Sequence, residues 1–327
     1  MAYHVLVTTE VNENQQNIIQ NILDSDQATV NFLHAISAKQ RNKILETADI
    51  LLTFDPFRDL SEQEYNHLNH IQFIQLISAG ADHLKYGKIP LTVKIASNSG
   101  AYAEPIAEHV VAMTLHHAKR LGEEHQNMVN GQFNQFTQNK FIKECTVGIL
   151  GFGGIGKATA RLFRSFGAQI FAMNTRGKSE ETTDFIGTME DLHHILASSD
   201  IVVISLPLNK HTRNLIGQKE LKSMKSDGIL INVARGEIIR QKDLYEHLKA
   251  RKAFKAGLES WWVEPLRHGS FELEYPLLDL PNVLAAPHNS SMVPGNMNHG
   301  FKEAAKNINK YLHGKSYKGK INRENYK

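Results

Sequence analysis

The chain has 327 residues, of which 41% are hydrophobic and 22% charged. These proportions are typical of folded domains, exclude a largely disordered protein, and at this length allow two domains of ordinary size. The single cysteine, Cys145, excludes an internal disulfide framework and fits a reducing compartment. We see neither a signal peptide nor the ~18 consecutive apolar residues that span a bilayer, so we expect a cytoplasmic protein with no membrane partner.

The formal net charge of +3 is unevenly distributed. The last 21 residues carry six basic side chains against one glutamate, which leaves +5 there and about −2 in the rest of the chain. A basic tail fits either contact with nucleic acid or simple solvation. Because few aromatic residues accompany it, we expect a solvated terminus and no nucleic-acid partner.

Short apolar runs alternate with helical patterns in the first hundred residues. We expect strands at 4–8, 50–54, 71–77 and 93–96, and helices at 14–23, 38–46 and 61–68. Strands that lack polar alternation and are separated by helices are typical of a parallel sheet covered on both faces.

A long amphipathic helix is expected over residues 102–121, and a Gln/Asn-rich loop follows it. A second series of strands comes next, at 146–150, 169–173, 201–206, 229–233, 255–259 and 283–286. The pattern therefore predicts an α/β protein with two doubly wound parallel-sheet domains and one boundary near Asn98.

A glycine-rich turn links the first strand of this second series to a helix. Gly151 permits a tight turn, Gly153 lets the backbone approach a pyrophosphate, and Gly156 lets the helix pack closely on the strand. The start of the following helix offers unpaired N–H groups to a phosphate. The spacing favours a dinucleotide-binding turn over a purely structural one.

The stretch "FAMNTRGKS" stands where such a unit normally places an acid on the adenine ribose. It offers Asn174, Thr175, Arg176 and Lys178 instead. An aspartate would repel the 2′-phosphate of NADP, whereas an arginine can bind it through charge-assisted hydrogen bonds. We therefore predict a preference for NADP over NAD. The alternative is that Asn174 bonds the hydroxyl of NAD while the basic side chains are solvated.

Three polar residues follow later strands, where ligands bind in open α/β sheets. They are Arg235, Glu264 and His288. An arginine can hold a carboxylate, a histidine can move a proton, and a nearby carboxylate favours the imidazolium and orients its ring. Each residue alone also fits a structural role in a turn. The 17 histidines show no convincing metal-ligand spacing, so we expect no metal.

Together these segments resemble those of a known protein family over nearly the full length of the chain. The chain resembles the D-isomer-specific 2-hydroxyacid dehydrogenases, among them glyoxylate and hydroxypyruvate reductases, in the motifs "GFGGIG", "DIVVISLPLNKHTRNLIG", "GILINVARGEII", "GLESWWVEP" and "PHNSS". The resemblance implies Arg235, Glu264 and His288 as the catalytic trio. It implies a flavodoxin-like substrate domain of residues 1–98 plus 289–327, and a Rossmann dinucleotide-binding domain of residues 99–288.

The resemblance also implies the remaining site residues. The substrate would meet Ser78, Ala79, Gly80, Arg235 and His288. The cofactor would meet Gly151, Gly153, Gly154, Ile155, Gly156, Asn174, Thr175, Arg176, Lys178, Leu206, Pro207, Thr212, Val233, Ala234, Arg235, Glu259 and His288. Glu259 departs from the family, which usually has aspartate there. Glu264 in place of glutamine argues against the formate dehydrogenase branch.

The resulting hypothesis is an enzyme that transfers a hydride between NADP(H), or NAD, and a 2-oxoacid/D-2-hydroxyacid pair. One alternative is an NAD(P)-sensing regulatory protein on the same scaffold. Another is a glycine turn that binds S-adenosylmethionine, in which the later motifs have no role. The family usually forms homodimers, so we expect one here. In the helix at 102–121, Ile106, Val110, Met113 and Leu121 fit either the dimer face or the core of their own domain.

Overall fold

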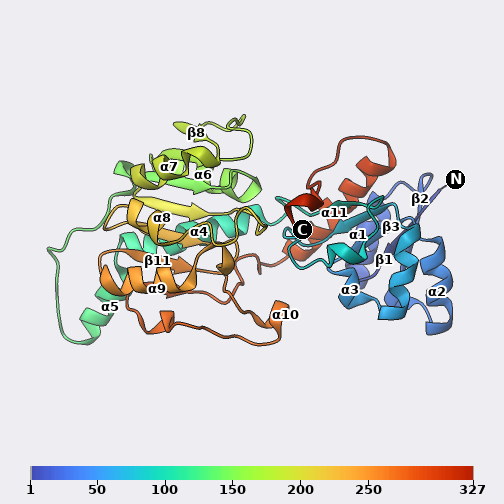
Figure 1. Cartoon of the computed structure of the whole chain (residues 1–327), viewed down its shortest axis with the longest axis horizontal. Coiled ribbons are helices and arrows are strands. Elements are labelled where there is room, and N and C mark those ends of the chain that lie inside the picture. Colours follow the sequence, from blue (N-terminus) through green and yellow to red (C-terminus); the bar gives the residue numbers. More distant parts are fainter. Residues whose placement is uncertain (1, 327) are drawn as a thin grey trace. The chain divides into compact units, whose positions relative to one another are not determined.

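The computed structural model describes residues 2–326. The chain divides into two compact units, Met1–Tyr102 with Pro294–Lys327 and Ala103–Val293. Each unit is built around one parallel sheet with helices packed on it (Figure 1). Two α/β units with parallel sheets were expected from the sequence, and this fold class is confirmed.

The first unit contains a five-stranded sheet in the order β2-β1-β3-β4-β5. This order is that of flavodoxin-like proteins. Its strands are β1 (Tyr3–Val7), β2 (Ala28–Phe32), β3 (Ile50–Thr53), β4 (Phe73–Leu76) and β5 (Lys94–Ala96), and all of these pairs are parallel. The predicted strands overlap four of them. The sequence analysis missed β2, an edge strand in which Thr29 and Asn31 interrupt the apolar pattern.

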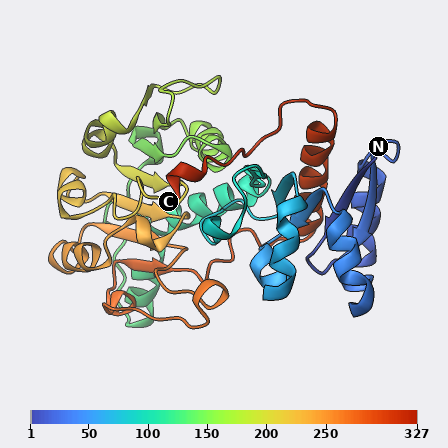
Figure 2. The ribbon, with the colours of Figure 1, turned by 45° about the vertical axis from the view of Figure 1, so that its right-hand side comes forward.

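The helices of the first unit come from both ends of the chain. They are α1 (Glu13–Ile22), α2 (Ala38–Thr47), α3 (Pro56–Asp59) and α11 (Asn296–Leu312). Helix α11 packs beside α1 and against β4, and Figure 2 shows it next to the strands from the start of the chain. Phe301, Ala304 and Ile308 of α11 are buried in the same core as Ile19 of α1. The last residues of the chain are therefore part of the fold of the first unit.

One helix of this unit differs from the expectation. Residues 61–68 were expected to be α-helical, but Glu62–His70 is a 3₁₀ helix. Glu64 accepts hydrogen bonds from the backbone and hydroxyl of Ser61 and pairs with Arg41 at 2.9 Å, so its polar contacts hold the segment. Because the segment has few apolar residues, it gains little from forming a longer α-helical face.

The second unit contains a seven-stranded sheet in the order β12-β11-β10-β9-β6-β7-β8. Its strands are β6 (Thr146–Leu150), β7 (Gln169–Met173), β8 (Phe185–Gly187), β9 (Ile201–Ile204), β10 (Ile229–Asn232), β11 (Lys255–Leu258) and β12 (Val283–Ala285). Read from β8, the first six strands have the Rossmann order, and β12 extends it. The sequence analysis missed only the three-residue strand β8.

Helices cover this sheet and contribute its core. They are α4 (Ala103–Ala118), α5 (Leu121–Val129), α6 (Gly154–Ser165), α7 (Leu192–Ser198), α8 (Gln218–Ser223), α9 (Gln241–Ala250) and α10 (Pro265–His268). The four residues of β9, "IVVI", are each completely buried. Burying an aliphatic side chain of this size stabilises the fold by roughly 1.5–3 kcal/mol.

The single helix expected over 102–121 is in fact two. Arg120 adopts a left-handed conformation with φ of 53°, which ends α4 and starts α5 in a new direction. Ile106, Val110 and Met113 of α4 are at most 9% exposed, and Met113 faces Gly257 of β11. These three residues therefore serve the core of their own unit, whereas Leu121 is 57% exposed.

The glycine turn between β6 and α6 is held by close backbone contacts. Gly151 has φ of +100°, and Ser205 donates its hydroxyl to the Gly151 carbonyl at 2.7 Å. A Cβ at Gly156 would lie 2.3 Å from the Gly151 carbonyl oxygen. A Cβ at Gly153 would meet no atom within 4 Å. Packing within the protein therefore excludes a side chain at Gly156, whereas at Gly153 it does not.

We predict that Gly156→Ala destabilises the second unit by about 1–3 kcal/mol, because the added methyl must displace backbone. Gly153→Ala should cost less than about 1 kcal/mol, the usual penalty of alanine at a helix N-cap. Urea unfolding followed by circular dichroism measures both. Equal losses for the two variants would contradict this account of the turn.

Candidate active site

The three candidate catalytic residues follow three adjacent strands of the second unit. Arg235 comes after β10, Glu264 after β11 and His288 after β12. These strands are neighbours and run parallel, so their carboxyl ends share one edge of the sheet. That edge is where ligands bind in open α/β sheets.

His288 and Glu264 form a direct pair. Nδ1 of His288 lies 2.8 Å from Oε2 and 3.0 Å from Oε1 of Glu264. Glu264 is only 5% exposed, whereas the His288 side chain is 36% exposed. His288 has φ of 55°, a left-handed conformation that is uncommon for a residue with a side chain and is found at active sites. Within the described residues, Nε2 of His288 has no hydrogen-bond partner.

Hydrogen bonds fix both the carboxylate and the backbone of Glu264. The Trp261 N–H donates to Oε1 at 2.7 Å, and the Glu264 N–H donates to Nδ1 of His268 at 2.9 Å. Burial alone would raise the pKa of Glu264. The hydrogen bond and charge of His288, the Trp261 N–H and the charge of Arg235 outweigh burial and lower that pKa. Glu264 is therefore an ionised, oriented partner at neutral pH.

Arg235 belongs to a turn shaped by a fully buried amide. Asn232 donates to the Arg235 carbonyl at 2.9 Å and accepts from the Ala234 N–H at 3.0 Å. Arg235 also donates from Nη1 to the Ala234 carbonyl at 2.7 Å. Arg235 follows β10, the parallel neighbour of β11, so its loop lies at the same edge of the sheet as the His288–Glu264 pair.

Further contacts join the loops that carry Arg235 and Glu264. Arg267 forms a two-pronged ion pair with Glu237, at 3.0 and 3.2 Å, and both side chains are mostly buried. Trp262 donates from its indole to the Ile239 carbonyl at 2.7 Å. Sequence reasoning missed the Arg267–Glu237 pair, because two residues 30 positions apart leave no local pattern.

The predicted cofactor residues surround the carboxyl ends of β6, β9 and β10. Gly154, Ile155 and Gly156 form the first turn of α6, while Val233 and Ala234 follow β10 and are buried. Leu206 and Pro207 follow β9. The Thr212 hydroxyl donates to the Pro207 carbonyl at 2.6 Å and accepts from the Asn209 N–H, so Thr212 braces this loop.

Glu259 fits a polar ligand at the same edge of the sheet. It is completely buried, and its Oε1 accepts from the Ser290 N–H at 2.8 Å. Its Oε2 has no hydrogen-bond partner among the described residues. A buried acceptor without a partner is costly and calls for a donor from a ligand or water. The carboxamide of a nicotinamide carries such a donor.

The loop after β7 presents basic side chains to solvent. The side chain of Asn174 accepts from the Arg176 N–H at 2.8 Å and donates to the Lys178 carbonyl at 3.0 Å, which folds the loop. Thr175, Arg176 and Lys178 are exposed. Across the described part of the chain, neither Arg176 nor Lys178 forms an ion pair.

The predicted substrate residues Ser78, Ala79 and Gly80 belong to the first unit, just after β4. The Ser78 hydroxyl donates to the Gly80 carbonyl at 2.8 Å, and the Asn98 N–H donates to the Ser78 carbonyl at 2.9 Å. Within residues 2–326, the N–H groups of Ala79 and Gly80 donate no hydrogen bond. This loop therefore leaves two amides open to an anion.

Two further features are absent from the described residues. Among the described residues, no group of three or more His, Cys, Asp or Glu side chains is placed to hold a metal ion. The same residues include no helix of the length and apolarity that a membrane crossing requires.

Comparison with known proteins places the chain in a family. Residues 111–290 match the model of the D-isomer specific 2-hydroxyacid dehydrogenase, NAD binding domain. The chain belongs to this family. The glyoxylate reductase/hydroxypyruvate reductase of Mus musculus is 30% identical over 253 residues, which is 76% of each chain. The protein is therefore an NAD(P)-dependent 2-hydroxyacid dehydrogenase.

Solved structures match the fold over nearly the whole chain. A D-isomer specific 2-hydroxyacid dehydrogenase from Xanthobacter autotrophicus, solved with NADPH, has a TM-score of 0.80 at 20% identity and covers 100% of both chains. One from Lactobacillus delbrueckii, solved with NAD, has a TM-score of 0.76 at 22% identity and covers 98% of this chain and 100% of its own. Since both cofactors occur on this fold, the choice between them depends on the residues of this chain.

Proposed function

We propose that this enzyme interconverts a 2-oxoacid and a D-2-hydroxyacid with NADP(H), and that Arg235, Glu264 and His288 carry the chemistry. The single observation behind the proposal is the His288–Glu264 pair at the carboxyl edge of a Rossmann-order sheet. We further propose residues 1–98 plus 289–327 as the substrate domain and residues 99–288 as the dinucleotide-binding domain.

His288 is the proposed acid–base group. Its Nδ1 is engaged by Glu264, which leaves Nε2 to give a proton to the substrate oxygen in reduction and to remove it in oxidation. The ionised Glu264 holds the ring in one orientation and stabilises the imidazolium. The buried position of Glu264 keeps this interaction strong, because water screens it little.

Arg235 is the proposed substrate-binding residue. Its planar guanidinium can hold a carboxylate through two hydrogen bonds and polarise the adjacent carbonyl. We propose that the open amides of Ala79 and Gly80, with Ser78, also bind the substrate carboxylate. Relatives named for glyoxylate and hydroxypyruvate suggest small 2-oxoacids as the first substrates to assay.

The dinucleotide would be held by the glycine turn and Glu259. Gly153, where a Cβ meets open space, would accommodate the pyrophosphate, and the first turn of α6 would bind it. Oε2 of Glu259 would accept from the carboxamide. The bound nicotinamide supplies or accepts the hydride. An assembled set of acid–base and carboxylate-binding groups, with relatives named as reductases, favours an enzyme over a regulatory protein.

We predict that His288→Ala lowers turnover by roughly 10²–10⁴-fold, the usual contribution of acid–base catalysis, while dinucleotide affinity changes little.

A second prediction concerns Glu264. Glu264→Gln should move the alkaline limit of 2-oxoacid reduction to lower pH, because the imidazolium loses its charged partner. Absorbance of the reduced cofactor measures both, across a panel of 2-oxoacids. Near-native turnover of His288→Ala would show that His288 is not the acid–base group. An unchanged pH profile of Glu264→Gln would show that Glu264 and His288 do not interact in the working enzyme.

The loop after β7 supports NADP as the preferred cofactor. Arg176 and Lys178 are exposed and form no ion pair among the described residues, so both charges are available to a 2′-phosphate. Asn174 uses its amide to fold the loop, which weakens the alternative that this side chain recognises the ribose hydroxyl of NAD. A phosphate bearing roughly −1.5 to −2 charges would meet no acid at position 174.

We predict that the native enzyme prefers NADPH and that Arg176→Ala loses roughly 10- to 100-fold in kcat/KM for NADPH, the equivalent of one charged hydrogen bond of ~1.5–3 kcal/mol. Activity with NADH should be nearly unaffected. Lys242→Ala, which removes an exposed charge on α9, is the matched control. A native preference for NADH, or an Arg176→Ala variant that keeps its full NADPH preference, would refute the proposal.

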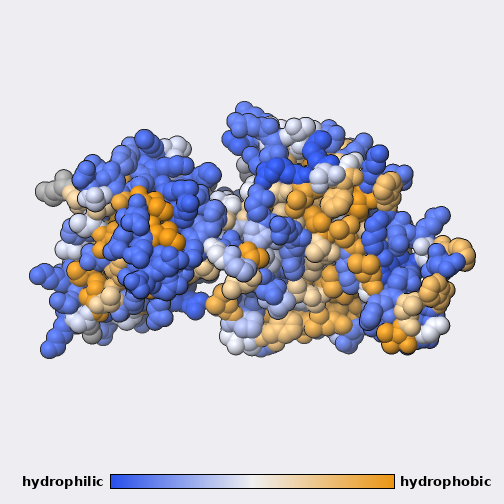
Figure 3. Space-filling view, turned by 180° about the vertical axis from the view of Figure 1, so that it is seen from behind, coloured by the Kyte–Doolittle hydropathy of each residue, from blue (hydrophilic) through white to orange (hydrophobic). Residues whose placement is uncertain are grey.

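We also propose that the enzyme is a homodimer, with α5 and the following loop at its interface. This segment exposes six large apolar residues, Leu121, Met128, Val129, Phe133, Phe136 and Phe141. Figure 3 shows hydrophobic residues at its lower right, where the α5 segment of Figure 1 lies when seen from behind. Exposed apolar surface of this extent is typical of an interaction site. Unlike the α4 residues considered first, these side chains are not used by the core.

We predict a molecular mass of two chains by light scattering at micromolar concentration, and a mass of one chain for the double variant Phe133→Ser/Phe136→Ser. These side chains are 73% and 86% exposed, so their loss should not unfold the unit. Leu91→Ser, at a 76% exposed position of the first unit, should remain dimeric. A monomeric native protein would contradict the proposed assembly.

A further inference from the structure

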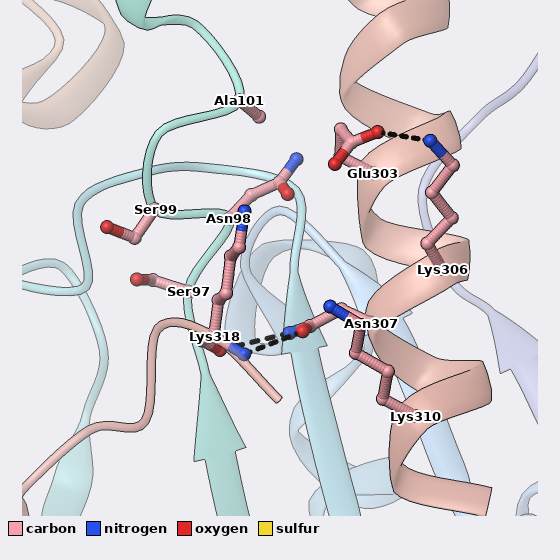
Figure 4. Close-up of a pocket in the computed structure, with 9 residues that line it drawn as sticks. All are labelled: Ser97, Asn98, Ser99, Ala101, Glu303, Lys306, Asn307, Lys310 and Lys318. Atoms are coloured by element: carbon pink, nitrogen blue, oxygen red, sulfur yellow. Dashed lines mark hydrogen bonds and ion pairs between the residues drawn. The ribbon is translucent and has the colours of Figure 1, made fainter. Parts of the chain in front are cut away.

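A small polar cavity lies in the first unit, between α11 and the segment that follows β5. It has a volume of about 50 Å³. Ser97 and Ser99 line one side, Glu303, Lys306 and Lys310 line the other, and Lys318 of the C-terminal segment closes it (Figure 4). Since one water needs ~10–15 Å³ by this measure, the cavity has room for an ion of about four or five heavy atoms.

The cavity carries an excess of positive charge. Glu303 pairs with Lys306 at 2.8 Å. Burial would raise the pKa of Glu303, but the Lys306 hydrogen bond and the charges of Lys306, His299 and Lys318 lower it, so its carboxylate neutralises one lysine. Within the described chain, the ammonium groups of Lys310 and Lys318 form no ion pair. Figure 4 shows both side chains directed into the space between α11 and the Ser97 segment.

The backbone around the cavity is held by buried amides. Asn307, which is 7% exposed, donates to Oε1 of Gln75 at 2.6 Å and to the Lys318 carbonyl at 3.0 Å, and it accepts from the Lys318 N–H at 2.8 Å. Asn98, which is 5% exposed, donates to the Ile77 and Gly300 carbonyls. Lys318 is therefore fixed opposite α11 at its Cα, although its side chain is exposed.

Ser97 also belongs to the lining. The residue is only 5% exposed. Its backbone is fixed, because its N–H donates to the Gly319 carbonyl at 2.8 Å. Lys306 and Lys310 lie four positions apart on α11, where like charges repel each other and destabilise a helix. Glu303 offsets the charge of Lys306, and an anion in the cavity would offset that of Lys310.

We propose that this cavity binds a small oxyanion with two negative charges, a phosphate group that is either free or the end of a small metabolite. Lys310 and Lys318, which form no ion pair among the described residues, supply the two charges that hold it. None of these residues belongs to the proposed substrate or dinucleotide sites. The segment that contains Ser97 and Ser99 leads from β5 into α4.

Isothermal titration calorimetry with inorganic phosphate tests the proposal, against sodium chloride at matched ionic strength. We expect saturable binding to the native protein and a loss of at least roughly tenfold in affinity for Lys310→Gln/Lys318→Gln. The control Lys302→Gln/Lys315→Gln removes the same charge from exposed positions of α11 and the C-terminal segment and should change affinity less than about twofold. Glu303→Gln should bind more tightly, because it releases Lys306.

Two further arms identify the ligand and the site. The first is the same titration on the Arg176→Ala variant, which lacks the proposed 2′-phosphate contact. Phosphate should still bind to this variant with unchanged affinity. Glycerol 3-phosphate should bind at least as tightly as phosphate if the natural ligand is a phosphate monoester, and more weakly if it is the free ion. Absence of saturable phosphate binding, equal losses in both lysine double variants, or weaker binding by Glu303→Gln would overturn the proposal.

Discussion

The parallel direction of the strands in the second unit is the constraint on which the site depends. Because β10, β11 and β12 are adjacent and parallel, the residues that follow them reach the same edge of the sheet. Each strand is only three or four residues long, and the loop that carries the polar residue follows it. Arg235, Glu264 and His288 are distant in sequence, and strand direction alone brings their loops together.

His288 and Glu264 form a direct contact at this edge of the sheet. A carboxylate as buried as Glu264 is tolerated only with partners that favour its charge, and it has the imidazole, the Trp261 N–H and the charge of Arg235. The same contacts restrict the ring of His288 to one orientation. The left-handed backbone of His288 costs of order 1–3 kcal/mol, which the surrounding contacts must offset.

The sequence predicted what depends on local pattern and missed what depends on distant contacts. Apolar runs such as "IVVI" identify strands because burial on both faces leaves no polar alternation. The edge strand β2 was missed since Thr29 and Asn31 break that pattern. The helix break was missed because it falls at Arg120, a residue type that rarely takes the left-handed conformation. The trio was predicted because each member follows such a run. The Arg267–Glu237 pair and the Trp261 donor were not, because only the folded chain brings them together.

The candidate binding groups share one physical property, which is that the fold leaves them unsatisfied while satisfying their neighbours. Oε2 of Glu259 has no partner in the described chain, although Oε1 of the same carboxylate has one. Arg176 is exposed on a loop in which Asn174 accepts from the Arg176 N–H and donates to the Lys178 carbonyl. A buried acceptor left unpaired costs roughly 1–3 kcal/mol, which the right donor recovers on binding. A ligand that donated a hydrogen bond to Oε2 of Glu259 would therefore gain affinity by relieving a cost of the free protein, and one without such a donor would not.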